Sequence, residues 1–134
     1  MTAKEIFMKI AYTVVRVLVG LLFIFSSLSF LLNSVVPPEQ TGNMKVFMDG
    51  MIASGYLFHA IKVVELVCGL AFVSGFFVPL ASVVISPIIV NILLVHIFLE
   101  PSGLPIGIIL TIANLFFAYY HKELFIPLLK PKAA

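Results

Sequence analysis

One long apolar stretch limits what this chain can fold into. Residues 56–99 are apolar apart from a few polar side chains, and the strongest breaks in the run are at Gly75 and Pro79. A membrane-spanning helix needs about 20 predominantly apolar residues, so the stretch predicts two spans joined by a tight turn. The whole chain is 62% hydrophobic and only 10% charged, against roughly a quarter charged in soluble domains. These properties exclude a soluble protein.

The same criterion predicts four spans, at about residues 7–32, 56–76, 79–99 and 104–120. Pro37 and Pro38 follow the first span and exclude a continuous helix there. The apolar run of the first span is longer than that of a signal peptide and lacks a following small-residue cleavage motif, so we expect it to be retained. The sequence therefore predicts one all-α integral membrane domain over residues 1–134, a four-helix transmembrane bundle.

A shorter helix is expected between the first two spans, at about residues 43–54. Its apolar residues recur at helical spacing, at Met44, Phe47, Met48, Met51 and Ile52. Lys45 and Asp49 fall off this stripe. The pattern predicts an amphipathic helix that lies at the membrane surface or covers the bundle.

The distribution of lysines predicts the orientation of the chain in the membrane. Those that flank the first and last spans are Lys4, Lys9, Lys122, Lys130 and Lys132. The long loop after the first span has only Lys45, offset by Glu39 and Asp49. Cytoplasmic loops carry the excess of positive charge, so both termini are expected to be cytoplasmic. The formal net charge of +2 is too small to indicate a nucleic-acid partner.

Polar residues inside the spans are the candidate functional residues. Lys62 and Glu65 are three residues apart in the second span, on one face of a helix. Charged groups in lipid are costly, so we expect them to face the interior and pair. At a rise of about 1.5 Å per residue, Arg16 and Glu65 differ in depth by about 7 to 8 Å, which predicts a direct or water-bridged contact. Asn91 and Asn114 lie at comparable depths and complete one central cluster.

This predicted cluster has two interpretations. Polar contacts between helices can hold spans together without taking part in chemistry. The same residues could instead line a cavity for a polar head group or relay a proton, as ionisable residues within membranes commonly do. His96 lies near the outer end of the third span. It is either solvated, or a partner for a quinone ring or a proton donor, because histidine titrates near neutral pH.

The sequence contains no pattern typical of a bound metal or a covalent cofactor. Cys68 is the single cysteine and lies inside a span, so the chain has neither a disulfide framework nor a redox dithiol. The histidines His59, His96 and His121 are too scattered to indicate a metal or haem site. Any redox role would therefore need an outside cofactor or partner.

Three segments together resemble the DoxX family of small bacterial membrane proteins. They are "RVLVGLLFIFSSLSFLL", "ASGYLFHAIKVVELVCGLAFVSGFFVPLASVVISPIIVNILLVHIFLEPSGLP" and "LFFAYYHKELFIPLL". The most specific part is the second span, where Glu65 precedes a Gly-Leu-rich segment and a short turn. Arg16 and Glu65 are the positions of this chain that best match the family's pattern. The family often has a glycine and a lysine late in the first span, where this chain has Ser27 and apolar residues, so a role for that lysine is not carried over.

The resemblance implies a four-helix bundle in the bacterial inner membrane. Some members are linked to quinone-dependent oxidation of reduced sulfur compounds or to membrane complexes that handle oxidative stress. We therefore predict a membrane subunit that binds a quinone or another lipophilic ligand while a soluble or membrane oxidoreductase supplies the redox chemistry. The predicted ligand-binding or proton-relay residues are Arg16, Lys62, Glu65, Asn91, His96 and Asn114.

Two other functions remain open from the sequence. In the first, the chain is a structural or assembly partner whose polar cluster binds no ligand. In the second, it is a small transporter similar to the four-helix multidrug exporters, although those place their essential carboxylate in the first helix, where this chain has Arg16. Membrane lipids are expected partners in each case, and a second copy of the chain is a further candidate. No motif decides whether the chain is itself an enzyme.

Overall fold

The computed structural model describes residues 1–132, and its regular elements are all helical. The six α-helices and two short 3-10 helices are α1 (Ala3–Leu31), α2 (Gly42–Ala53), α3 (Leu57–Ser74), α4 (Val78–Phe98), η1 (Pro101–Gly103), α5 (Leu104–Tyr120), α6 (Lys122–Phe125) and η2 (Ile126–Leu129). Four segments are long and apolar enough to cross a membrane: α1, α3, α4 and η1 with α5. The predicted fold class is confirmed.

Helix α1 begins at residue 3, four residues before the predicted start of the first span. Thr2 and Glu5 form a capping box: Thr2 Oγ1 accepts from Glu5 N at 3.2 Å, and Glu5 Oε2 accepts from Thr2 N at 2.8 Å. This arrangement satisfies two backbone donors at the start of the helix. The first helical turn therefore forms outside the apolar run that hydropathy detects.

A tight turn joins α3 to α4, at the position that the glycine and proline predict. Gly75 ends α3 in the left-handed conformation with φ of 84°, and Phe77 also has a positive φ, of 58°. Pro79 lies in the first turn of α4, where its missing N–H has no helical acceptor to lose. The turn joins α3 to α4 through a connection of three residues, 75–77.

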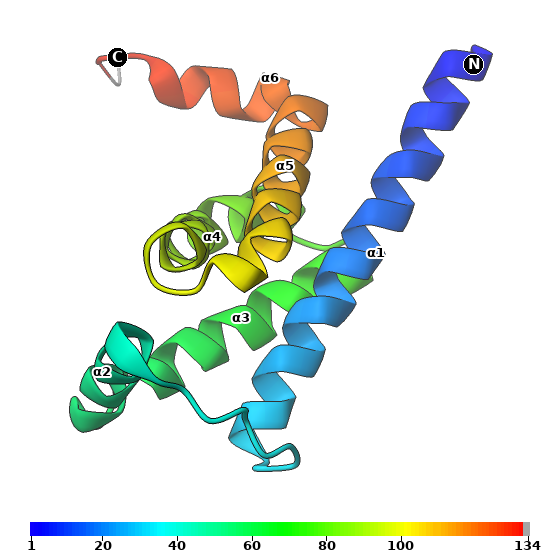
Figure 1. The fold of residues 1–134 in the computed structure, drawn as a ribbon. Coiled ribbons are helices and arrows are strands. Elements are labelled where there is room, and N and C mark those ends of the chain that lie inside the picture. Colours follow the sequence, from blue (N-terminus) through cyan, green and yellow to red (C-terminus); the bar gives the residue numbers. More distant parts are fainter. Residues whose placement is uncertain (133–134) are drawn as a thin grey trace.

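Helix α4 lies across the direction of the other spans (Figure 1), whereas α1 and α3 pack along each other, from Arg16 and Phe72 at one end to Phe30 and Phe58 at the other. In Figure 1, α4 is seen nearly end-on, whereas α1 and α5 run close to the plane of the picture and α3 is inclined to both. The most extensive helix contact is between α1 and α3. At their crossing the backbones of Gly20 and Gly69 meet without intervening side chains. The core beside this crossing is apolar and includes Phe23, Phe72, Ile85 and Phe117.

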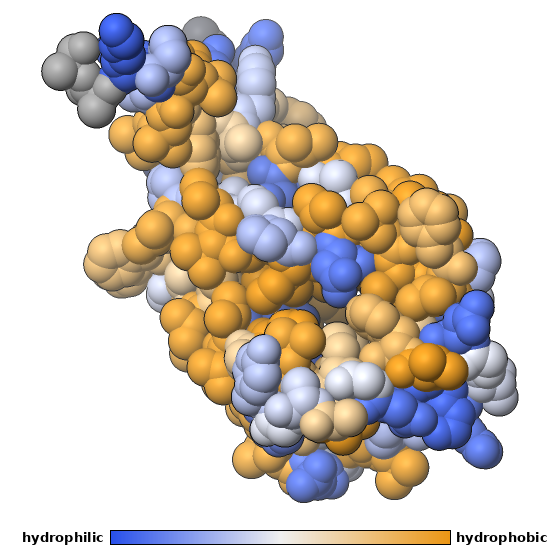
Figure 2. All heavy atoms as spheres, turned by 90° about the vertical axis from the view of Figure 1, so that its left-hand side faces the viewer, coloured by the Kyte–Doolittle hydropathy of each residue, from blue (hydrophilic) through white to orange (hydrophobic). Residues whose placement is uncertain are grey.

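The outer surface is largely apolar, as expected for contact with lipid. Figure 2 shows the face that is on the left in Figure 1, where hydrophobic side chains dominate and hydrophilic ones gather mainly at its lower and upper ends. Side chains such as Leu70, Val90, Ile109 and Leu115 are more than half exposed. In a soluble protein such a surface would be an association site, but here it matches the hydrocarbon of a bilayer.

Both described ends of the chain lie at the same end of the molecule, as Figure 1 shows, and the α1–α2 loop lies at the opposite end. Beyond α5 the chain turns sharply, and α6 and η2 run across the end of the bundle (Figure 1). This segment combines exposed Leu124 and Leu128 with Lys122 and Lys130. Such a composition is typical of a segment at the membrane surface.

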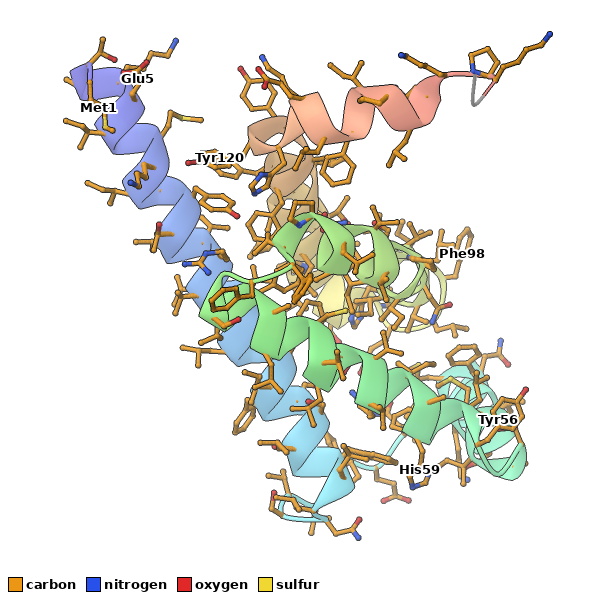
Figure 3. All side chains as sticks on the ribbon, turned by 180° about the vertical axis from the view of Figure 1, so that it is seen from behind. Met1, Glu5, Tyr56, His59, Phe98 and Tyr120 are labelled. Atoms are coloured by element: carbon orange, nitrogen blue, oxygen red, sulfur yellow. The ribbon has the colours of Figure 1, made fainter. Side chains whose placement is uncertain are left out.

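An aromatic cluster joins α1 to the end of α5. Tyr12 stacks on Tyr120 with ring centroids 3.9 Å apart, and its hydroxyl lies 2.7 Å from His121 Nε2. Figure 3 shows Tyr120 pointing towards α1. Burial lowers the pKa of His121 below its ordinary value of 6.5. Near neutral pH the ring is therefore uncharged, and Nε2 can accept the hydrogen bond from Tyr12.

This cluster predicts a loss of stability in mild acid. Because the pKa of His121 is lower in the folded than in the unfolded chain, the unfolded chain binds more protons as the pH falls below about 6.5. The His121 contribution is thus fully present above that pH and declines below it. We expect the melting temperature of the wild type to fall more between pH 7.5 and pH 5 than that of His121→Gln. Equal falls in the two proteins would contradict this.

Candidate functional site

Lys62 and Glu65 form an ion pair in the membrane-spanning part of α3, with Lys62 Nζ 3.1 Å from Glu65 Oε2. The Glu65 side chain is only 5% exposed and that of Lys62 is 14% exposed. Lys62 Nζ also donates to Ser26 Oγ on α1 at 3.0 Å and lies 5.4 Å from the ring centroid of Phe58. The pair thus links α3 to α1.

The pair lines a cavity of about 410 Å³, which we call the main pocket. Helices α2, α3 and α4 form its walls. Its lining residues are Phe47, Met48, Met51, Leu57, Phe58, Ile61, Lys62, Glu65, Pro87, Ile88, Asn91, Ile92, Val95 and His96. Most of this lining is apolar, with a few polar groups among it, which is the usual composition of a site for a small lipophilic molecule.

Helix α4 supplies two further polar groups to the main pocket. Asn91 faces it with an exposed side chain. His96 lies at the other end of the same wall, and its Nδ1 is 3.1 Å from the carbonyl oxygen of Glu100 and 4.0 Å from Glu100 Oε2. A hydrogen bond through Nδ1 fixes which ring nitrogen can contact a ligand. The structure therefore brings together four of the six candidate residues, namely Lys62, Glu65, Asn91 and His96.

Arg16 lies elsewhere and does not pair with Glu65 as the depth estimate indicated. Its Nη1 donates to the carbonyl oxygen of Phe72 at 2.9 Å, about two turns along α3 from Glu65. Its guanidinium carbon lies 5.7 Å from the ring centroid of Tyr12. The positive charge therefore stands at the carbonyl end of α3, where the helix dipole favours it. The estimate failed because it measured each depth from an assumed membrane edge, whereas the structure sets Arg16 beside Phe72 and Ser26 beside Lys62 along the α1–α3 contact.

Asn114 on α5 also belongs to a separate group. Its Oδ1 accepts from Ser82 Oγ at 2.7 Å, and its Nδ2 donates to Ser86 Oγ at 3.0 Å. These contacts join α5 to α4. The three residues line a different groove, on the α4–α5 side of the molecule. The expected single cluster is thus divided into three groups, centred on Lys62 and Glu65, on Arg16, and on Asn114.

Several residues that line the main pocket or contact its ion pair were not among the sequence candidates. Ser26 is the acceptor on α1 for Lys62, and Phe58 contacts the ammonium group. Helix α2 contributes Phe47, Met48 and Met51, which belong to its predicted apolar stripe. The stripe predicted the buried face of α2 but not which neighbour it covers. A polar residue in the late first span, such as Ser26, was the available signal for a partner of Lys62.

Neither the cysteine nor the histidines form a second site of polar ligands. Cys68 is buried against the apolar core. His59 lies at the start of α3 (Figure 3), with its ring 5.2 Å from that of Phe30. Among residues 1–132, no three His, Cys, Asp or Glu side chains are placed to hold a metal ion.

These features define a small membrane protein with four apolar spans and a largely apolar pocket that contains an ion pair. The family model for DoxX matches residues 11–97, which run from Ala11 in α1 to Ile97 in α4 and include every residue of the main pocket. The chain belongs to the DoxX family. Comparisons with curated proteins and with solved structures gave no match.

Proposed function

We propose that the main pocket binds a lipophilic ligand with a polar head, such as a quinone, and that the chain is the membrane subunit of a redox-linked complex. The observation that carries this proposal is the position of the Lys62–Glu65 pair in the wall of a largely apolar cavity of about 410 Å³. A ligand ring and tail would contact the apolar lining. The head would contact the charged pair and the amide of Asn91.

The donors and acceptors fit a carbonyl or hydroxyl head group. Lys62 has three N–H donors, of which one bonds Ser26 and one bonds Glu65, so the third is free for a carbonyl oxygen. Asn91 adds a second donor and an acceptor. Glu65 can take a proton from a hydroxyl or return it. Because positive and negative charge are already balanced within the pair, a neutral ligand fits better than an ion.

Helix α2 would cover the bound ligand. Phe47, Met48 and Met51 face the pocket, whereas Lys45 and Asp49 form an exposed ion pair on the other side of the helix. Methionine side chains adapt to ligands of different shape. Helix α2 has no fully buried residue and packs mainly on α3, so it can move with little loss of packing. Entry between α2 and α4 is the route that we propose.

We further propose that the chain lies in the bacterial inner membrane with both termini in the cytoplasm. Both described ends lie at one end of the molecule (Figure 1), and the flanking lysines are concentrated there. Positive charge is enriched on cytoplasmic segments. The main pocket, with α2 and the start of α3, would then open towards the outer side. A partner oxidoreductase would exchange electrons with the ligand.

Native mass spectrometry with lipid extraction tests the ligand. We expect a stoichiometric quinone or other lipid to purify with the wild type and to be lost from Glu65→Gln, because glutamine keeps the volume but removes the charge. Asn114→Leu is the matched control, since it removes a polar group of the same membrane region outside the main pocket. It should retain the ligand. No bound molecule in the wild type, with added quinones leaving its melting temperature unchanged, would contradict the proposal.

A structural role is the second candidate, and the bond between Lys62 and Ser26 favours it. Lys62 joins α3 to α1 whether or not a ligand is present. If the pair is only a clasp, Glu65→Gln should lower the melting temperature of a protein that carries no ligand. The search for function would then turn to protein partners.

A further inference from the structure

Lys62 borders a second cavity besides the main pocket. This cavity measures about 190 Å³ and lies between the end of α1, the following loop and α3. Its lining residues are Ser26, Ser29, Phe30, Val35, Pro37, Phe58 and Lys62. We call it the vestibule. Phe58 and Lys62 line both cavities, so the side chain of Lys62 stands at the boundary between them.

The vestibule has the volume to hold water, and polar side chains form part of its wall. A water molecule occupies about 30 Å³ and needs two to four polar partners, so the volume accommodates several molecules. Ser26 Oγ, Ser29 Oγ and Lys62 Nζ supply donors and acceptors in the wall. The main pocket offers no such set on the α2 side, where Phe47, Met48 and Met51 form the wall. Water is therefore expected in the vestibule beside Ser26, Ser29 and Lys62.

The vestibule opens towards the loop after α1. Val35, which forms part of its wall, is 54% exposed, and Pro37 beside it is also exposed. Ser26 lies deeper, five residues before the end of α1 at Leu31. At a rise of about 1.5 Å per residue, this places it about 7 to 8 Å inside the helix end. A polar path therefore leads from the loop past Ser29 and Ser26 to Lys62.

We propose that the vestibule is a water-filled entry through which water and protons reach the Lys62–Glu65 pair from the loop side of the membrane. Water in the vestibule would explain how a charged lysine is tolerated within a membrane helix, because Lys62 would contact water on one side. The other groups around the pair are Ser26 on α1 and Asn91 and His96 on α4, and α2 brings no titratable side chain into the main pocket. The proposal does not depend on a ligand in the main pocket.

Thiol labelling tests the vestibule, with three consecutive positions on α1. We expect Ser26→Cys, in a Cys68→Ala background and reconstituted in nanodiscs, to react with a charged, membrane-impermeant methanethiosulfonate. Ser27→Cys and Leu28→Cys are matched controls at nearly the same depth. Ser27 is fully buried in the core, and Leu28 is 36% exposed on the outer surface. Ser26→Cys should react at least about tenfold faster than either, because the reagent needs both access and a hydrated thiolate.

A second variant tests whether the reagent reaches position 26 through the vestibule or through fraying of the end of α1. Adding Ser29→Phe to the Ser26→Cys protein should fill the vestibule and slow the labelling at position 26 by about tenfold, since access controls the rate. Labelling of Ser26→Cys no faster than Leu28→Cys would overturn the proposal. So would equally fast labelling at all three positions. Either labelling result can occur with or without a bound quinone. The labelling test can therefore contradict the vestibule without contradicting the proposed ligand of the main pocket.

Discussion

Glu65→Leu is expected to lower the free energy of unfolding by about 3 kcal/mol, because it leaves Lys62 as an unpaired cation among apolar helices. Breaking a buried pair on one side costs about 3 to 5 kcal/mol in proteins. The lower end applies here, since Lys62 retains its bond to Ser26 and is 14% exposed. Equilibrium unfolding in mixed micelles would measure the loss.

The double variant decides whether the loss comes from the unpaired charge. The double variant Lys62→Met with Glu65→Leu removes both charges, so that no unpaired cation is left. We expect it to cost less than the sum of the single changes by at least about 2 kcal/mol, since apolar replacement of a buried pair is often neutral. The control pair is Lys45→Ala and Asp49→Ala on α2, whose side chains are 56% and 60% exposed. A coupling there should stay below about 1 kcal/mol. Additive losses at Lys62 and Glu65 would contradict the expectation.

The sequence predicts the helices well, because their limits depend on local chemistry. Helix α5 begins at Leu104 and ends at Tyr120, the bounds predicted for the fourth span. Helix α3 ends, and α4 begins, within two residues of the expected positions. Gly75 ends α3 because it can adopt a positive φ. The first span is the exception, since the capping box of Thr2 and Glu5 is a local signal that hydropathy does not include.

The ion pair of the site is predicted because it depends on one helix. The contact between Lys62 and Glu65 follows from their spacing in α3 alone, and it is present in the structure. The contacts of Arg16 and Asn114 depend on the register and rotation of neighbouring helices. Their positions in sequence fix a depth along each helix axis but not the direction of that axis. The sequence therefore identified the polar residues but not how they divide into groups.

Close contact between α1 and α3 predicts the second large effect, at Gly20 and Gly69. A Cβ atom at Gly69 would lie 2.9 Å from the carbonyl oxygen of Gly20, and one at Gly20 would lie 2.8 Å from that of Gly69. Backbone atoms cannot move aside as flexible side chains can, so the helices must separate. Small residues permit such approach in membranes, where van der Waals packing is a main source of helix association.

Gly20→Ala and Gly69→Ala are each expected to lower the free energy of unfolding by about 1 to 3 kcal/mol, the usual cost of overpacking, despite the better helix propensity of alanine. Gly50→Ala is the matched control, because Gly50 lies inside α2 with no atom within 4 Å of its added Cβ. It should gain up to about 1 kcal/mol in helix propensity. Since Lys62 on α3 bonds Ser26 on α1, separation of these helices should also loosen the pocket wall. Equal stability of all three variants in mixed-micelle unfolding would show that α1 and α3 do not meet at these glycines.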